Sequence, residues 1–203
     1  MPISANGAAW ELQRNDEEAM AYSRIDKASG LQICRVETVM KASLNALVAL
    51  QRDAAQIPKW MDGVKSSTVV READDYYITH TLVPSPWPVK DRDSVVRSDV
   101  HQQDDGTVVI EFASVPDVVP PQKNHERVQN VKGCWRFTPL RDGKTRVEYE
   151  VMVDPGGKLP AWLVNRFALD VPYNSIKIMH RVVRDPRYQK AKRWVREVDP
   201  LYA

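Results

Sequence analysis

The sequence has little of what marks disulfide-stapled, metal-binding or membrane-spanning proteins. It contains only two cysteines, Cys34 and Cys134, and both fall in strand-like segments far apart, so we expect buried free thiols. Its four histidines show no HxH or HxxxH spacing, and no metal site is predicted. No apolar run approaches the ~20 residues needed to cross a bilayer. These absences predict a soluble domain held by an ordinary hydrophobic core.

The sequence also lacks the motifs of common catalytic and cofactor-binding sites. It has no GxSxG, Walker loop, GxGxxG or CxxC sequence, and no cofactor is predicted. The 29 basic and 27 acidic residues give a net charge of +2, which predicts no strong attraction to nucleic acid. The opening MPISANGAAW has no basic region followed by an apolar core, so no signal peptide is expected, and the compartment stays open.

Basic residues gather near the C-terminus. Between Arg181 and Glu197 the chain has seven basic and two acidic residues. We therefore divide the chain into one domain over residues 1–184 and a basic extension over residues 185–203. Two interpretations of the extension are open, a helix in a membrane interface or a helix docked on the domain, and we favour docking. The helix is predicted from the spacing of Tyr188, Ala191, Trp194, Val195 and Val198.

Alternating apolar and polar residues predict a series of strands. A helix interrupts the series, beginning at Leu44 with Ser43 as its N-cap and ending before Pro58. From residue 65 onward the strands follow one another with turn signals between them, as in an antiparallel meander. The predicted strands cover residues 10–15, 19–25, 31–41, 66–72, 76–83, 94–101, 107–115, 127–139 and 144–153.

A long helix follows the last strand. The segment Asp154-Pro155-Gly156-Gly157 ends that strand, because proline cannot donate to the ladder and the glycines allow a sharp turn. The helix then runs to Val183 with an apolar stripe broad enough to lie across a sheet. Pro172 has no amide hydrogen, so we expect a kink between residues 159–171 and 173–183. The stripe contains Leu159, Trp162, Leu163, Phe167, Leu169, Val171, Tyr173 and Ile176.

This order of elements predicts an α+β fold, in which a curved antiparallel sheet of about nine strands wraps around the C-terminal helix. The space between sheet and helix forms an internal hydrophobic cavity. The positions predicted to face inward have almost no acidic or basic side chains, so general acid–base catalysis is not expected. Two long proline-bearing loops, residues 84–93 and 116–126, are expected to be functional. In the first loop, we expect Arg92 to form an ion pair with its acidic neighbours.

Three motifs carry a resemblance to a known family. They are PWPVKDRD at residues 86–93, GCWRFTP at residues 133–139 and VDPGGKLP at residues 153–160. Their order, together with the order of elements from Trp10 to Arg184, resembles the START (steroidogenic-acute-regulatory-related lipid-transfer) domain family of the helix-grip, Bet v 1-like fold. The resemblance implies a hydrophobic tunnel under the C-terminal helix that holds one lipid, with that helix and the long loops near its mouth.

One departure from the family concerns the ligand. START proteins that bind sterol are known for an inward Glu–Arg pair, and the matching positions here are Thr81 and Ser98. Arg97 is adjacent but should face the other way by alternation. We therefore expect the pair of hydroxyls to form the polar end of the cavity and to suit a neutral head group. The predicted ligand-binding residues are Thr81, Trp87, Ser98, Ile110, Phe112, Trp135, Phe137, Tyr149, Val151, Leu163, Phe167 and Val171.

The predicted function is the binding, and transfer, of a single lipid or other hydrophobic small molecule under a helical lid. The predicted partners are that ligand and, transiently, a membrane surface, with no nucleic acid. Two alternatives remain open. One is an enzyme of the same fold, of the aromatase/cyclase or hydrolase type, which would need titratable groups inside the cavity. The other is a ligand-sensing regulatory module.

Overall fold

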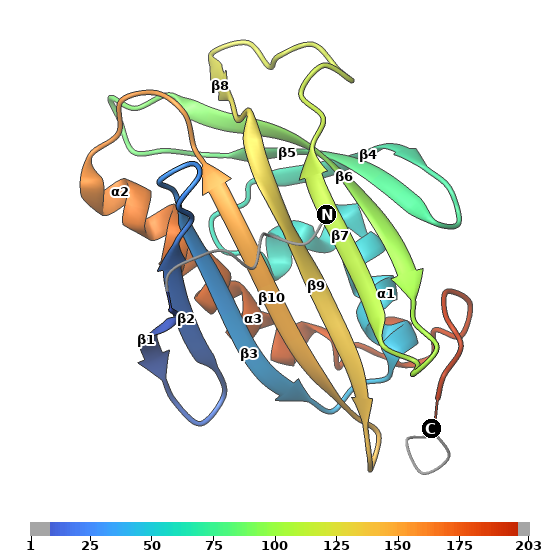
Figure 1. Cartoon of the computed structure of the whole chain (residues 1–203). Coiled ribbons are helices and arrows are strands. Elements are labelled where there is room, and N and C mark those ends of the chain that lie inside the picture. The colour runs from blue at the N-terminus through green and yellow to red at the C-terminus, as the bar shows by residue number, and fades with distance from the viewer. Residues whose placement is uncertain (1–8, 199–203) are drawn as a thin grey trace.

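A bent, open sheet forms the frame of the molecule in the computed structural model, which describes residues 9–198 (Figure 1). The strands lie in the order β1-β2-β3-β10-β9-β7-β6-β5-β4, and β8 pairs with β6 outside this path. All pairings are antiparallel except that of β8 with β6. The strands are β1 (Glu11–Asn15), β2 (Met20–Ile25), β3 (Gln32–Met40), β4 (Ser66–Glu72), β5 (Tyr76–Val83), β6 (Asp91–Gln102), β7 (Val108–Ser114), β8 (His125–Arg127), β9 (Asn130–Leu140) and β10 (Lys144–Asp154).

The α+β helix-grip architecture is confirmed, with two differences in the strands. First, β6 begins at Asp91 rather than at residue 94, so the first long loop covers only residues 84–90. Second, the predicted strand over residues 127–139 is split, because β8 pairs with the start of β6 while β9 pairs with β7 and β10. The first residues of β6 pair on both sides, since Asp93 lies opposite Leu82 of β5 and opposite Arg127 of β8.

Two helical segments follow β3 and pack on the inner side of the sheet. Helix α1 (Leu44–Arg52) begins as predicted at the N-cap Ser43, whose side chain accepts a hydrogen bond from the amide of Ala46. The 3₁₀ segment η1 (Ala54–Lys59) comes next. Leu47 of α1 and Trp60, just after η1, are almost completely buried and belong to the main hydrophobic core.

The C-terminal helix is divided, but not by a proline kink alone. Helix α2 (Ala161–Asn165) passes through a π-helical turn, η2 (Arg166–Asp170), into α3 (Val171–Val182). In η2 the amide of Val171 donates to the carbonyl of Arg166, five residues earlier. Pro172 follows immediately and cannot donate to Ala168, which removes one α-helical bond at the same place. The predicted break is therefore a widened turn directly before Pro172.

The predicted helix of the basic extension is wrong beyond its first turn. Within residues 185–198 only α4 (Pro186–Gln189) is helical, and residues 190–198 have no regular structure. Asn45 holds this segment, because its side-chain oxygen accepts hydrogen bonds from the amides of Trp194 and Val195. The ring of Trp194 lies 4.2 Å from the guanidinium carbon of Arg52. The amides of Trp194 and Val195 thus bond to a side chain instead of to carbonyls of a helix. Residues 199–203 lie outside the described part.

Both cysteines are free, as predicted. Cys34 is fully buried, and burial raises the pKa of its thiol to about 12. Cys134 is half-buried, and burial raises the pKa of its thiol to about 11. No helix within residues 9–198 has the length and apolar character that a bilayer span requires.

Candidate functional site

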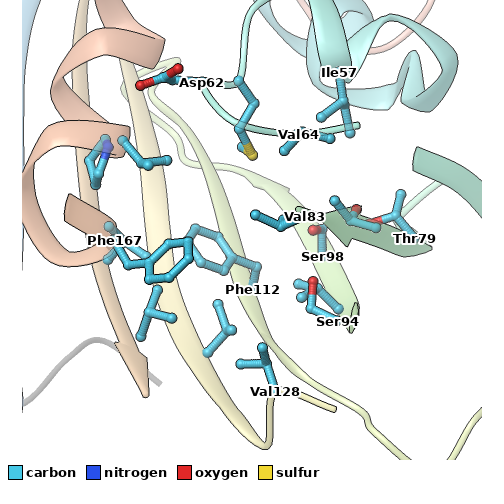
Figure 2. Close-up of a pocket in the computed structure, with 18 of the residues that line it drawn as sticks. Ile57, Asp62, Val64, Thr79, Val83, Ser94, Ser98, Phe112, Val128 and Phe167 are labelled. Carbon is cyan, nitrogen blue, oxygen red and sulfur yellow. The ribbon is translucent and has the colours of Figure 1, made fainter. Parts of the chain in front are cut away.

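A cavity of about 180 Å³ lies between the inner face of the sheet and the η2–α3 segment (Figure 2). Strands β5, β6, β7, β9 and β10 supply its walls, and Phe167, Val171 and Pro172 cover it from the helical side. Met61 and Val64, in the connection between η1 and β4, close another side. The lining is mostly apolar, as expected for a site that binds a hydrophobic molecule.

Aromatic rings form one wall of the cavity. Trp135 and Tyr149, opposite each other on β9 and β10, stack with ring centroids 3.8 Å apart and planes 7° from parallel. Phe112 lies 6.0 Å from Tyr149, and Trp60 meets Trp135 edge-on at 6.0 Å. Burial raises the pKa of the Tyr149 hydroxyl, so this wall carries no charge near neutral pH. The wall is a rigid apolar surface.

Gly133 makes the position of Phe112 possible. A Cβ atom at residue 133 would lie 2.5 Å from the Phe112 ring and 2.1 Å from the carbonyl oxygen of Glu150. Real Cβ atoms do not approach other atoms so closely, and the carbonyl belongs to the paired strand β10. The missing side chain therefore lets the Phe112 ring lie against the sheet.

We expect Gly133→Ala to lower the free energy of unfolding by about 1–3 kcal/mol, because overpacking forces the ring and the strand apart. It should also narrow the cavity, since Phe112 is displaced from its recess. Chemical denaturation measures the first effect, and Cys134→Ala, on the next residue and the opposite face, serves as control. A stability of Gly133→Ala equal to that of the wild-type protein would contradict the close packing.

Hydroxyl groups form the opposite wall. Thr81 shares a hydrogen bond of 3.0 Å with Ser67, and Ser98 is hydrogen-bonded to Tyr77. Burial raises the pKa of Tyr77 to about 12, so its hydroxyl stays neutral. Thr81 pairs across the strands with Ser94, whereas Ser98 pairs with Tyr77. Thr81 and Ser98 therefore do not meet at a polar end but belong to a stripe of hydroxyls along β5 and β6.

The charged side chains on the cavity wall are Asp62 and Arg92, and both are engaged by the protein. Asp62 accepts a hydrogen bond of 2.9 Å from the side chain of Asn174. Arg92, only 4% exposed, donates to the carbonyls of Lys90 and Pro155 and, at 3.1 Å, to that of Gly156. Burial lowers the pKa of Arg92, although a guanidinium stays protonated at any ordinary pH.

The predicted ion pair of Arg92 is wrong. Within residues 9–198, Arg92 forms no ion pair, and its carbonyl contacts instead hold the 84–90 loop against the turn before α2. Asp93 points to the outer side of the sheet, where Arg127 donates to it at 2.6 and 3.0 Å and His80 lies 3.0 Å away. Arg92 and Asp93 are consecutive residues of the strand β6, so their side chains point to opposite faces of the sheet. In a loop, as predicted, the two side chains could have met.

The Asp93–Arg127 pair also fixes the second long loop. Arg127 donates to the carbonyls of Pro116, Val119 and Pro120, and the amide of Gln122 donates to Asp93. Burial alone would raise the pKa of Asp93, but the hydrogen bonds from Arg127, Gln122 and His80 outweigh it and lower that pKa. The 116–126 loop, which was predicted to be functional, is therefore held on the sheet by the buried side chains of Asp93 and Arg127.

The structure places most of the predicted binding residues on the cavity wall and a few elsewhere. Trp87 is 93% exposed, at the tip of the first loop. Ile110 and Phe137 are fully buried in the solid core, and Leu163 is the buried residue of α2. Those on the wall are Thr81, Ser98, Phe112, Trp135, Tyr149, Val151, Phe167 and Val171.

Some residues of the wall were missed. Tyr77, Thr79 and Ser94 share the inward side of their strands with Thr81 and Ser98, so extending the same alternation would have found them. Trp60 and Asp62 lie in an irregular connection, where no periodic pattern gives the direction of a side chain. Their place on the wall depends on tertiary packing.

Comparison with known proteins agrees with this geometry. The START domain family model matches residues 3–195. The protein belongs to the START domain family. Phosphatidylcholine transfer protein from Bos taurus is 29% identical over 182 residues, which cover 86% of this START protein and 84% of the bovine one. The uncharacterized protein PA1579 of Pseudomonas aeruginosa is 30% identical over 177 residues, covering 86% and 88% of the two chains.

Solved structures show the same fold. The STAR-related lipid transfer protein from Xanthomonas axonopodis superposes on this START protein with a TM-score of 0.80 and 30% identity, over 87% of this chain and 99% of that one. The Zhui aromatase/cyclase from Streptomyces superposes with a TM-score of 0.52 and 13% identity, over 74% and 91%. The second likeness concerns the fold alone.

Proposed function

We propose that this START protein binds a single lipid in the cavity and carries it between membranes. The observation that carries the proposal is the cavity itself, which is covered by helix and lined by an aromatic wall and a neutral hydroxyl wall. The similarity to proteins named for lipid transfer, over most of their length, supports the same function. Withdrawing an acyl chain from water contributes about 0.8 kcal/mol per CH₂ group, so a long chain needs few polar contacts.

Loading requires the walls to move apart. The cavity volume of about 180 Å³ is below the ~300–1,000 Å³ of typical ligand pockets. The walls are strands hydrogen-bonded to their neighbours, whereas the helical cover is held by side chains alone. We therefore assign the movement to α2 and η2, which together form the lid.

The two parts of the C-terminal helix are anchored very differently. In α2 only Leu163 is buried. In α3, Tyr173 and Lys177 both bind the carboxylate of Asp16, and His180 lies 2.7 Å from the hydroxyl of Thr38. In η2, Asp170 pairs with Arg14 and Arg166 lies 4.0 Å from Asp62, so α2 is the least anchored part of the lid. Its few contacts, and the irregular turn that follows it, make α2 a low-stability segment next to a fixed one. Opening should therefore begin at α2, bend at η2 and leave α3 in place.

A membrane-facing surface lies beside the lid. Arg92 joins the 84–90 loop to the turn before α2, and Figure 1 shows both segments together at one end of the sheet. Trp87 on the loop is 93% exposed and Trp162 on α2 is 58% exposed. Lys90 and Lys158, on the same two segments, are also exposed. Exposed tryptophans with lysines nearby suit the interface of a bilayer with an anionic component.

Replacing both Trp87 and Trp162 by alanine should weaken binding to vesicles of phosphatidylcholine and phosphatidylserine by about tenfold, since two large apolar contacts are lost. The rate of lipid transfer between vesicles should fall together with vesicle binding. Leu12, 55% exposed on the edge strand β1, provides the matched control Leu12→Ala. Equal vesicle binding by the double variant and the control would place the membrane contact elsewhere.

Transfer of fluorescent lipid from donor to acceptor vesicles tests the proposed function. The expected result is transfer at a rate proportional to protein concentration, with NBD-labelled phosphatidylcholine or diacylglycerol as probe. Absence of transfer with both probes, together with binding of lipid, would instead favour a ligand sensor. Catalysis is not favoured, because Tyr77 and Tyr149 titrate far above neutral pH and Asp62 is engaged by Asn174.

A further inference from the structure

Two hydroxyl groups on the hydroxyl wall form no hydrogen bond within the described part of the protein. Thr79 and Ser94 line the cavity, and within residues 9–198 neither side chain has a hydrogen-bond partner. Thr79 is only 7% exposed, so bulk water does not reach it freely. By contrast, the neighbouring hydroxyls of Thr81 and Ser98 are bonded to Ser67 and Tyr77. A hydroxyl that faces the cavity and is not bonded to the protein is available to a ligand with the matching group.

The position of the two hydroxyls suits one small polar group within a long apolar molecule. Thr79 pairs with Val96, and Ser94 pairs with Thr81, so Thr79 and Ser94 are diagonal neighbours on one face of the sheet. Such neighbours lie roughly 7–8 Å apart at the backbone and their side chains can converge. Figure 2 shows both on the wall that faces Phe112 and Phe167. A ligand between these walls meets polar donors on one side and aromatic rings on the other.

The chemistry of the wall selects against charge. A hydroxyl donates one hydrogen bond to an oxygen acceptor and offers no countercharge. The guanidinium of Arg92, the cation on the cavity wall, is already bound to carbonyl oxygens of the protein. A phosphate or carboxylate beside Thr79 would therefore lose its hydration without gaining an ion pair.

We propose that Thr79 and Ser94 donate hydrogen bonds to the ester carbonyl oxygens of an uncharged acylglycerol, so that the cavity selects neutral ester lipids. This inference rests on the proposed lipid-binding function. It predicts that the oxygen acceptors, and not only the chain length of the lipid, determine affinity.

A matched pair of ligands tests it, namely dioleoylglycerol and the corresponding dialkenyl ether, which lacks only the two carbonyl oxygens. The wild-type protein should bind the ester at least about fivefold more tightly than the ether, since each hydrogen bond contributes a factor of about 2 to 12. The double variant Thr79→Val, Ser94→Ala should bind both alike. Its affinity for the ether should equal that of the wild-type protein, and its melting temperature should not fall.

The control is Thr68→Val, on the exposed face of β4, which should keep the preference for the ester. Equal binding of ester and ether by the wild-type protein would overturn the inference and leave the lipid-binding function standing. A preference that survives in the double variant would also overturn it, since the carbonyls would then be bound elsewhere. Failure of the wild-type protein to bind either lipid would refute the proposed function, and the inference with it.

Discussion

Replacing Arg127 by alanine should lower the free energy of unfolding by about 3–5 kcal/mol, the usual cost of removing one partner of a buried ion pair. Asp93 is completely buried, and one of its oxygens already lacks a partner within the described residues. Without Arg127 the carboxylate would stay in the protein with only His80 and an amide beside it. The carbonyls of Pro116, Val119 and Pro120 would lose their donor as well. Denaturation in urea measures the loss.

The effect should depend on pH in a defined direction. The pKa of Asp93 is lowered in the folded protein, so its contribution is complete above the unfolded value of about 3.9 and is lost as the pH falls through the folded value. The difference between wild type and Arg127→Ala should therefore shrink in acid. Arg97→Ala, which removes a largely exposed pair with Asp99, is the control and should cost less than about 1 kcal/mol. A similar small loss for Arg127→Ala would show that the pair does not stabilise the fold.

Fixing the lid should stop lipid transfer without unfolding the protein. The side chains of Arg166 in η2 and Asp62 approach to 4.0 Å across the gap between the lid and the turn after η1. Cysteines at both positions, joined by a short cleavable thiol crosslinker, would hold the lid against that turn. Transfer between vesicles should then slow by about tenfold or more and recover on cleavage, because opening precedes loading.

The native thiols do not interfere with this experiment. Burial holds the pKa of Cys34 near 12 and that of Cys134 near 11, so neither is an efficient nucleophile at neutral pH. The uncrosslinked double variant and each single variant treated with the same reagent are the controls. Undiminished transfer by the crosslinked protein would exclude opening at η2 and favour entry past the 116–126 loop.

The architecture could be predicted from the sequence because its determinants are local. Alternation identified the inner sides of β9 and β10, and hence Trp135 and Tyr149, since successive side chains of a regular strand point to opposite faces. The N-cap Ser43 and the Pro-Gly-Gly turn after β10 are short signals with fixed geometry. These features do not depend on distant parts of the chain.

The departures come from tertiary contacts that no local pattern contains. β8 pairs with the start of β6, where Asp93 and Arg127 form an ion pair across 34 positions of sequence. The extension is not helical beyond Gln189, because Asn45 supplies the hydrogen bonds that a helix would have made internally. Inward direction alone could not separate Ile110 and Phe137, which fill the core, from Phe112 and Trp135, which border the cavity. The difference depends on how far the helices cover each strand.

Native mass spectrometry, after incubation with vesicles of phosphatidylcholine, phosphatidylethanolamine, diacylglycerol and cholesterol, tests whether the cavity holds a single lipid. We expect the protein to carry one lipid molecule per chain after the vesicles are removed, and denaturation to release this lipid for identification. Retention of the unmodified protein mass alone, or of lipids in variable numbers that follow their abundance in the vesicles, would contradict a single lipid held in the cavity.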